Sequence, residues 1–245
     1  VDPALAIPLT RVHGELRVPS GQKPLTHLQT VHVHLGTEDI LGRVALLDCQ
    51  EAEAGSAALV EILLERETLA LRGDRFILRD AGAQRTVAGG RVLDIFPPVR
   101  HKRAPQRLAL LYAMRSDDPA DTLGLLAGQA LAGVDLDRSA VSWNLTQAAA
   151  EDLWQRAGLR VIRDGNASLG FTAAAWAALE AKLLDALARE HERAPDMIGV
   201  ERERLRRMTA ANLPRPAFDA LSAELLASDQ IAQTRAWLHL PAHRA

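Results

Sequence analysis

The sequence predicts a multi-domain protein in which a small antiparallel β-barrel is followed by two winged-helix domains, each mainly α-helical with a β-hairpin. Three observations predict this. Short strand-like runs fill the first hundred residues, helical periodicity begins after Ala104, and helices followed by a hairpin or ribbon occur twice. A chain of 245 residues fits two or three domains. We expect the barrel at 1–98, a basic linker at 99–103, and winged helices at 104–171 and 172–245.

The expected barrel strands are short runs with Gly or Asp in most of the gaps between them. Along residues 28–35, every second side chain from Thr30 to His34 is polar, with Val or Leu between and after them, so one strand face is polar and the other apolar. Residues 36–39 are the expected turn into the next strand. Closure into a barrel would remove exposed strand edges. The expected strands are residues 10–18, 28–35, 40–47, 58–64, 75–79 and 86–95.

A proline pair separates the strand-rich part from the helical part. Pro97 and Pro98 end the last strand, because proline cannot donate to a strand ladder, and they open a short, stiff, basic connector that runs to Arg103. Residues 105–115 then carry leucines at helical spacing. The connector therefore marks the expected end of the barrel.

Helix-start residues and one hairpin signal define the first winged helix. Asp117-Asp118-Pro119 predicts a helix start, with acid and proline in the first turn. Asp137 is expected to cap a helix that continues to about Ala150, and another helix follows to Gly158. Asp164-Gly165-Asn166 predicts the turn of a closing β-hairpin.

The second winged helix repeats this order. Thr172 is expected to cap a long helix over 173–193, whose apolar side chains follow helical spacing. Shorter helices are expected at 201–208 and 214–227. A minimal ribbon formed by Ile231 and residues 237–240 closes the module.

The amino-acid composition limits which binding partners and which cellular compartment fit this chain. The net charge is −2, with 29 basic and 31 acidic side chains, so any contact with nucleic acid must use a local basic patch. Cys49 is the single cysteine; it fits a reducing compartment and is expected to be a small buried hydrophobe. No run of eighteen apolar residues suggests a membrane span. The start at Val1, without methionine or signal-peptide layout, suggests a piece of a longer protein.

Three segments carry a family resemblance: residues 24–47, residues 73–80, and residues 85–94 with their Ala88-Gly-Gly-Arg sequence. Together they resemble the third domain of translational GTPases of the elongation factor Tu type, and more narrowly the selenocysteine-specific elongation factors, SelB, of bacteria. The order of barrel, Pro-Pro-basic connector and winged helices fits this family. Downstream, the string from His191 to Arg206 looks like the hinge between helices in the family's second winged helix.

The resemblance implies a cytoplasmic factor that delivers selenocysteinyl-tRNA to the ribosome at recoded UGA codons, driven by GTP. The chain contains no Gly-x-x-x-x-Gly-Lys-[Ser/Thr] phosphate loop. We therefore expect this fragment to be no enzyme and to bind no cofactor, GTP and Mg²⁺ belonging to the full-length factor. The last pair of winged helices, which in the family grip the hairpin of selenoprotein mRNA, is also absent from the sequence. The expected form is a monomer, without membrane contact.

In the related factors, the third barrel contacts the acceptor and T arms of tRNA through the turn after the Arg-Phe-Ile-Leu-Arg-type strand and through an upstream basic residue. Here the resemblance places these contacts at the turn Asp80-Ala81-Gly82 and at Arg66, with Arg85 adding charge. A tight turn of small residues lets the backbone approach a phosphate. The turn is one residue longer than in the family. The alternative is that Arg66 is ordinary solvated surface between two glutamates, and that Gly82 only serves the turn.

Two further groups of residues are candidates for RNA contact. His32 and His34 lie on one strand face; a metal site there would need further ligands, which the sequence does not supply at ligand spacing. On the helix 201–208, Arg202, Arg206 and two more arginines fan out opposite the apolar face. The alternative for this helix is a solvated face in which Glu203 pairs with Arg207.

Two rival functions remain open at this stage. A DNA-binding winged-helix regulator with an appended β-barrel would need basic recognition helices, but the candidate helices 137–150 and 214–227 carry one arginine each. An enzyme domain would need a deep polar pocket with shifted ionisable groups. We interpret the winged helices as an arm that links the barrel to the RNA-binding end. The four tryptophans are expected to anchor cores rather than stack on bases.

Overall fold

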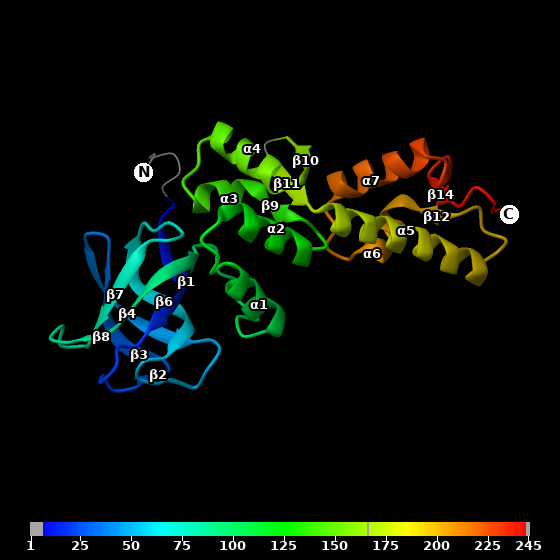
Figure 1. Ribbon diagram of the computed structural model, residues 1–245. Helices are drawn as coiled ribbons and strands as arrows, with labels where there is room; N and C mark the ends of the chain where they lie inside the picture. Colours follow the sequence, from blue (N-terminus) through cyan, green and yellow to red (C-terminus); the bar gives the residue numbers. More distant parts are fainter. Residues whose placement is uncertain (1–6, 166, 244–245) are drawn as a thin grey trace. The chain divides into compact units, whose positions relative to one another are not determined.

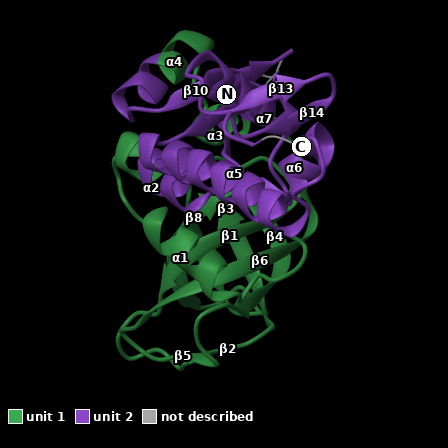
Figure 2. Ribbon diagram, turned by 90° about the vertical axis from the view of Figure 1, so that its right-hand side faces the viewer, with its two compact units in different colours: residues 1–122, 138–151 green, residues 123–137, 152–245 purple. Residues whose placement is uncertain are grey.

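The computed structural model describes residues 7–165 and 167–243, and these form two compact units. The first unit comprises residues 1–122 with 138–151, and the second comprises 123–137 with 152–245 (Figure 2). Helices α3 (Leu136–Ser142) and α4 (Gln147–Arg156) contribute residues to both units. None of the described helices is long and apolar enough to cross a membrane.

The first unit is built on a closed antiparallel barrel with the strand order β1-β6-β4-β3-β7-β8 (Figure 1). All six predicted barrel strands are confirmed. Their bounds are β1 Leu9–Arg17, β3 Gln29–Leu35, β4 Glu38–Leu46, β6 Ala57–Thr68, β7 Arg75–Arg79 and β8 Thr86–Asp94. A two-residue pair that was not predicted, β2 (Leu25–Thr26) with β5 (Glu51–Ala52), forms a separate small sheet.

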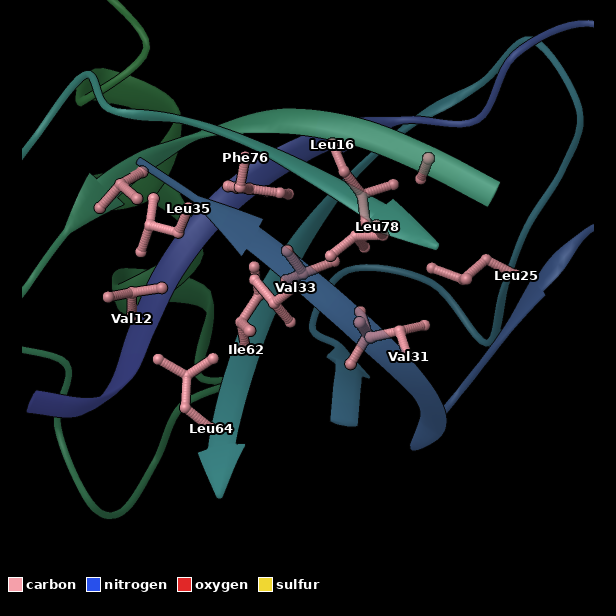
Figure 3. Close-up of a cluster of buried hydrophobic side chains, with 14 of the residues drawn as sticks. Val12, Leu16, Leu25, Val31, Val33, Leu35, Ile62, Leu64, Phe76 and Leu78 are labelled. Atoms are coloured by element: carbon pink, nitrogen blue, oxygen red, sulfur yellow. The ribbon is translucent and has the colours of Figure 1, made fainter. Parts of the chain in front are cut away.

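The barrel interior is filled by a cluster of buried apolar side chains (Figure 3), and these include Val31, Val33 and Leu35, which alternation predicted on the apolar face. Val31 and Val33 of β3 are fully buried, whereas His34 on the opposite face is partly exposed. The turn between β3 and β4 is shorter than predicted, because Leu35 pairs directly with Glu38 and only two residues connect the strands. A two-residue hairpin connection is the commonest solution for antiparallel neighbours. Asp39 therefore lies in a strand and not in a turn.

The connector after the barrel packs onto the barrel. Lys102 Nζ lies 2.6 Å from Glu61 Oε2, Arg103 donates to the Leu46 carbonyl at 2.6 Å, and Arg107 of α1 (Pro105–Ala113) donates to Asp94 at 2.6 Å. Charges as buried as Glu61 need such partners. Leu111 adds apolar contact, since it is buried with three leucines of the barrel, Leu47, Leu59 and Leu93.

The predicted single helix over 137–150 is wrong. The structure has two shorter helices there, α3 (Leu136–Ser142) and α4 (Gln147–Arg156). Asn144 between them takes a left-handed φ of 51°, which stops the first helix. Asp137 does not cap either helix; it lies inside α3, and its carboxylate accepts a hydrogen bond from the Ser168 backbone N–H at 2.6 Å. The preceding helix, α2, spans Pro119–Gln129, as the helix-start signal predicted.

The predicted hairpin of the first winged helix is confirmed as β10 (Arg160–Asp164) and β11 (Ala167–Phe171). Asn166 of its turn lies outside the described residues. A short strand that was not predicted, β9 (Val134–Asp135), pairs with β11 and makes the sheet three-stranded. Helices with a small sheet of this kind match the predicted winged-helix architecture.

The predicted elements of the second winged helix are also confirmed. Thr172 caps α5 (Ala173–Arg193), because its Oγ1 accepts a hydrogen bond from Ala175 N at 3.1 Å. The remaining elements are β12 Val200–Glu201, α6 Arg202–Thr209, α7 Arg215–Ala227, β13 Ala232–Thr234 and β14 Trp237–His239. The three strands form one sheet in the order β12-β14-β13.

The tryptophans and the cysteine differ in burial: some lie in a core and others are only partly buried. Trp154 and Trp176 are buried as predicted, whereas Trp143 and Trp237 are only partly buried. The Trp143 ring lies under the guanidinium of Arg72, 4.8 Å from its centroid. Cys49 is partly buried against the edge of the barrel core, and burial raises the pKa of its thiol.

Candidate RNA-binding site

A polar cluster lies on the outer face of the barrel across β4, β3 and β7. His32 stands opposite Arg79 of β7, and His34 stands opposite Asp39 of β4. His32 Nδ1 lies 2.9 Å from Asp39 Oδ1, and His34 Nε2 lies 3.9 Å from the same oxygen. The hydrogen bond from His32 lowers the pKa of Asp39. Asp39 therefore holds the His32 imidazole in place and lies near that of His34, and we name these four residues, His32, His34, Asp39 and Arg79, the histidine face.

Arg66 borders the histidine face from β6. Its guanidinium pairs with Glu38 and donates to the Asp39 carbonyl at 3.2 Å, and about half of its side chain remains exposed. The pairing with a glutamate and the exposure of the side chain agree with the alternative that Arg66 is ordinary solvated surface. An exposed pair of this kind contributes little to stability. The structure thus brings Arg66, His32 and His34 together on neighbouring strands, β6-β4-β3.

The loop after β7 is ordered by Asp80. Its Oδ1 accepts hydrogen bonds from the backbone N–H groups of Gln84 at 2.8 Å and Arg85 at 3.1 Å. The bond from Arg85, followed by that from Gln84, lowers the pKa of Asp80. Asp80 therefore shapes the loop, while Ala81, Gly82, Gln84 and Arg85 are exposed.

The arginines of α6 lie in the second unit and form a cluster of their own. Arg202 pairs with Asp219 at 2.8 Å, Arg204 with Glu190 at 2.7 Å, and Arg206 with Glu203 at 2.6 Å. Glu203 therefore pairs with Arg206, not with Arg207 as the alternative reading expected. Ion pairing leaves little free positive charge on this helix.

The described residues contain no group of three or more His, Cys, Asp or Glu side chains placed to hold a metal ion. Sequence reasoning missed two members of the histidine face, Asp39 and Arg79. The signal for Asp39 was the length of the hairpin: a two-residue connection would have placed it on the same face as His34. Arg79 could be placed only from the register between β3 and β7, which no local pattern reveals.

A closed barrel with a polar outer face, followed by helices and small sheets of the winged-helix type, defines a multi-domain protein that combines a β-barrel with winged-helix domains. Residues 11–99 match the family model described as the selenocysteine-specific elongation factor β-barrel domain, and residues 184–240 match the model of the elongation factor SelB winged helix. The chain belongs to the selenocysteine-specific elongation factor family, SelB.

Individual relatives agree with this assignment. The selenocysteine-specific elongation factor of Escherichia coli (strain K12) is 34% identical over 97% of this chain, and that of Haemophilus influenzae is 29% identical over 90%. The chain spans 36% and 35% of the lengths of these two relatives. A crystal structure of the bacterial selenocysteine-specific elongation factor EF-Sec has the same fold, with a TM-score of 0.63 at 14% identity, over 98% of this chain and 36% of that one.

Proposed function

We propose that the barrel of this chain contacts the acceptor and T arms of selenocysteinyl-tRNA through Arg66, the histidine face and the loop 80–85. The observation that supports this most directly is the convergence of Arg66, His32 and His34 on one outer face within the segment that matches the family's barrel. Phosphate contacts position a protein on RNA, and guanidinium and imidazole groups are suitable donors for them. The exposed tip at Ala81 and Gly82 adds a place where backbone can approach a phosphate closely.

We also propose that the two winged helices, divided at 104–171 and 172–245, form an arm toward the part of the factor that grips the mRNA hairpin. Helices α3 and α4 carry one arginine each, which argues against the DNA-binding regulator, because a recognition helix places several basic or amide side chains in the major groove. Arg202 and Arg206 stay predicted RNA contacts of lower priority, since both are engaged in ion pairs. GTP chemistry, ribosome binding, a monomeric state and a cytoplasmic location are proposals that depend on the family resemblance.

The combined substitution Arg66→Glu and Arg85→Glu tests the barrel proposal. We expect weaker binding of selenocysteine tRNA in a gel shift at fixed salt, because two positive groups become negative next to the phosphate backbone. Arg156→Glu with Arg189→Glu, two exposed arginines of the second unit in i,i+4 pairs, provides the same charge change as a control. Equal affinity of both double variants would remove the barrel from tRNA recognition.

A titration with the mRNA hairpin tests the arm proposal. We expect no specific binding of the hairpin by this chain, and only micromolar or weaker binding of tRNA, because part of the RNA-binding surface of the whole factor is not included. Tight capture of the hairpin would show that the winged helices of this chain read the message themselves.

A further inference from the structure

Four arginines surround a hollow of about 280 Å³ on the outer face of β1, β7 and β8. They are Arg17, Arg75, Arg91 and Arg115, accompanied by a single acid, Glu15. We name this site the basic hollow. It shares β7 with the histidine face but is lined by none of the residues assigned above. Ala88-Gly-Gly-Arg lies here, in a segment that carries the family resemblance, and none of these four residues is among the predicted RNA contacts.

The strand register explains why these arginines converge. Arg91 of β8 stands opposite Glu15 of β1 on one side and opposite Arg75 of β7 on the other. Arg17 stands opposite Gly89. Alternation along each strand then puts Arg17, Arg75 and Arg91 on the outer face.

Glu15 fixes two of the four guanidinium groups. Its Oε1 accepts a hydrogen bond from Arg91 Nε at 3.0 Å, and its Oε2 forms an ion pair with Arg115, 2.5 Å from Nε. Arg91 also donates to the Arg115 carbonyl at 2.6 Å and pairs with the exposed Asp117. One carboxylate within the hollow therefore orients two cations but neutralises only one. Pre-oriented guanidinium groups lose less entropy when they bind an anion.

The other two arginines, Arg17 and Arg75, have N–H donors that remain available to a ligand. Arg17 is exposed and donates one hydrogen bond to the Gly55 carbonyl at 3.2 Å. Arg75 is exposed, and the described residues give it no ion-pair partner. The lining thus carries three more positive than negative groups around a space suited to a small anion, since ligand pockets for larger molecules begin at roughly 300 Å³.

Glycine at position 89 leaves the floor of the hollow open, although the barrel fold does not require a glycine there. A Cβ at Gly90 would lie 2.1 Å from the Glu15 carbonyl oxygen, so strand packing requires that glycine. A Cβ at Gly89 would meet only the Phe76 carbonyl oxygen at 3.6 Å, an ordinary contact, and Gly89 has no left-handed φ. A side chain at 89 is therefore compatible with the fold and would fill the hollow.

We propose that the basic hollow binds a phosphate of an RNA backbone, as a second contact beside the face formed by Arg66, the histidine face and loop 80–85. The inference rests on the proposed function for its ligand. Arg75 and Arg79 lie four residues apart on the outer face of β7, about 13 Å at 3.3 Å per residue, so one RNA strand can reach both. Arginine forks suit phosphate oxygens, and a continuous basic strip suits a polyanion better than an isolated carboxylate.

The test is fluorescence anisotropy of the chain with a labelled selenocysteine tRNA transcript, at several salt concentrations. Arg17→Gln with Arg75→Gln should weaken binding about 10-fold and reduce the slope of log affinity against log salt by about 1, as expected for one lost phosphate contact. Gly89→Leu should weaken binding by a similar factor without any change of charge. Gly89→Ala is the matched control and should bind as the parent does, with equal urea midpoints confirming that each variant is folded.

The outcomes separate this inference from the proposed function. If Arg66→Glu with Arg85→Glu weakens tRNA binding while the hollow variants do not, the barrel proposal stands and the hollow is not an RNA site. If the hollow variants alone weaken it, the hollow is confirmed, and the proposed contact through Arg66, the histidine face and loop 80–85 fails. A parallel titration with poly-glutamate tests the remaining alternative, that the hollow binds an acidic protein segment. If the hollow variants lose poly-glutamate binding but keep tRNA binding, this alternative holds and the RNA inference is overturned.

Discussion

Gly89 and Gly90 show at the scale of single residues how differently two adjacent glycines can serve one strand. The alternation of β8 points position 90 into the barrel and position 89 outward, and only the inward one meets backbone at 2.1 Å. No local signal separates the two, because both read simply as glycine in a strand. The same limit applied to Asp39, whose place beside His34 followed from hairpin length and not from residue type.

We predict that Gly90→Ala lowers the free energy of unfolding by about 1–3 kcal/mol, because the new Cβ forces β1 and β8 apart. Gly89→Ala should change it by no more than about 0.5 kcal/mol. Urea unfolding of both variants checks the pair. A tolerant Gly90 would mean that the close approach of these two strands does not require glycine.

His13 is fully buried at the junction of the barrel with α1. Arg107 donates to its Nδ1 at 2.8 Å, and because arginine is only a donor, His13 accepts there and is neutral. Its Nε2 faces Glu61 Oε1 at 3.7 Å. Burial, together with the positive charge of Arg107, lowers the pKa of His13 below its ordinary value of 6.5, against the opposing influence of Glu61.

This lowered pKa predicts a pH dependence. Below pH 6.5 the unfolded chain takes up a proton at His13 that the folded chain refuses, so stability falls as the pH drops from 6.5 toward the folded pKa and is unaffected above it. His13→Gln should flatten this part of the curve of unfolding free energy against pH. His101→Asn, which removes an exposed histidine, is the control. Parallel curves for parent and His13→Gln would show that His13 is not the responsible group.

At the scale of elements, the sequence pattern predicted that helices form but did not predict where one helix ends and the next begins. The helical spacing over 137–150 continues through Trp143, so the pattern predicted one helix to about Ala150 and a second to Gly158, whereas the break between α3 and α4 lies before Gln147. The signals for the break are visible in retrospect: Asn144 takes the left-handed conformation, and Thr146 Oγ1 accepts from Ala149 N at 3.4 Å at the start of α4. Asn and Thr are common residues, so they identify the end of one helix and the start of the next only when the backbone angles are known.

The long helix α5 offers a clean element-scale prediction. Thr172→Ala removes the oxygen that accepts from Ala175 N and should cost about 1 kcal/mol of stability. Thr172→Ser keeps that oxygen and should cost much less. Thermal unfolding followed by circular dichroism measures both. Equal losses would point to the Thr172 methyl group, not the hydrogen bond, as the stabilising feature.

For the whole molecule, the pattern of charge pairing explains what the sequence could not show. A basic connector reads as exposed linker, yet Lys102, Arg103 and Arg107 pack on the barrel, and their partners lie 13 to 94 residues away. Pairings at such separations have no local signature. The compact unit therefore extends beyond residue 99, where the match to the family's barrel ends.

Lys102→Met should consequently destabilise the barrel although it lies outside the strands. Glu61 is 2% exposed and would lose its 2.6 Å partner, leaving Arg11 at 3.8 Å and neutral His13 as neighbours. Leaving a buried group without its partner costs about 1–3 kcal/mol, so hydrogen exchange should quicken in β1, β6 and β8 but not in α5 of the second unit. Glu61→Gln combined with Lys102→Met should recover part of the loss, because the unpaired charge is gone. Unchanged exchange in β6 would show that the connector docks without stabilising the barrel.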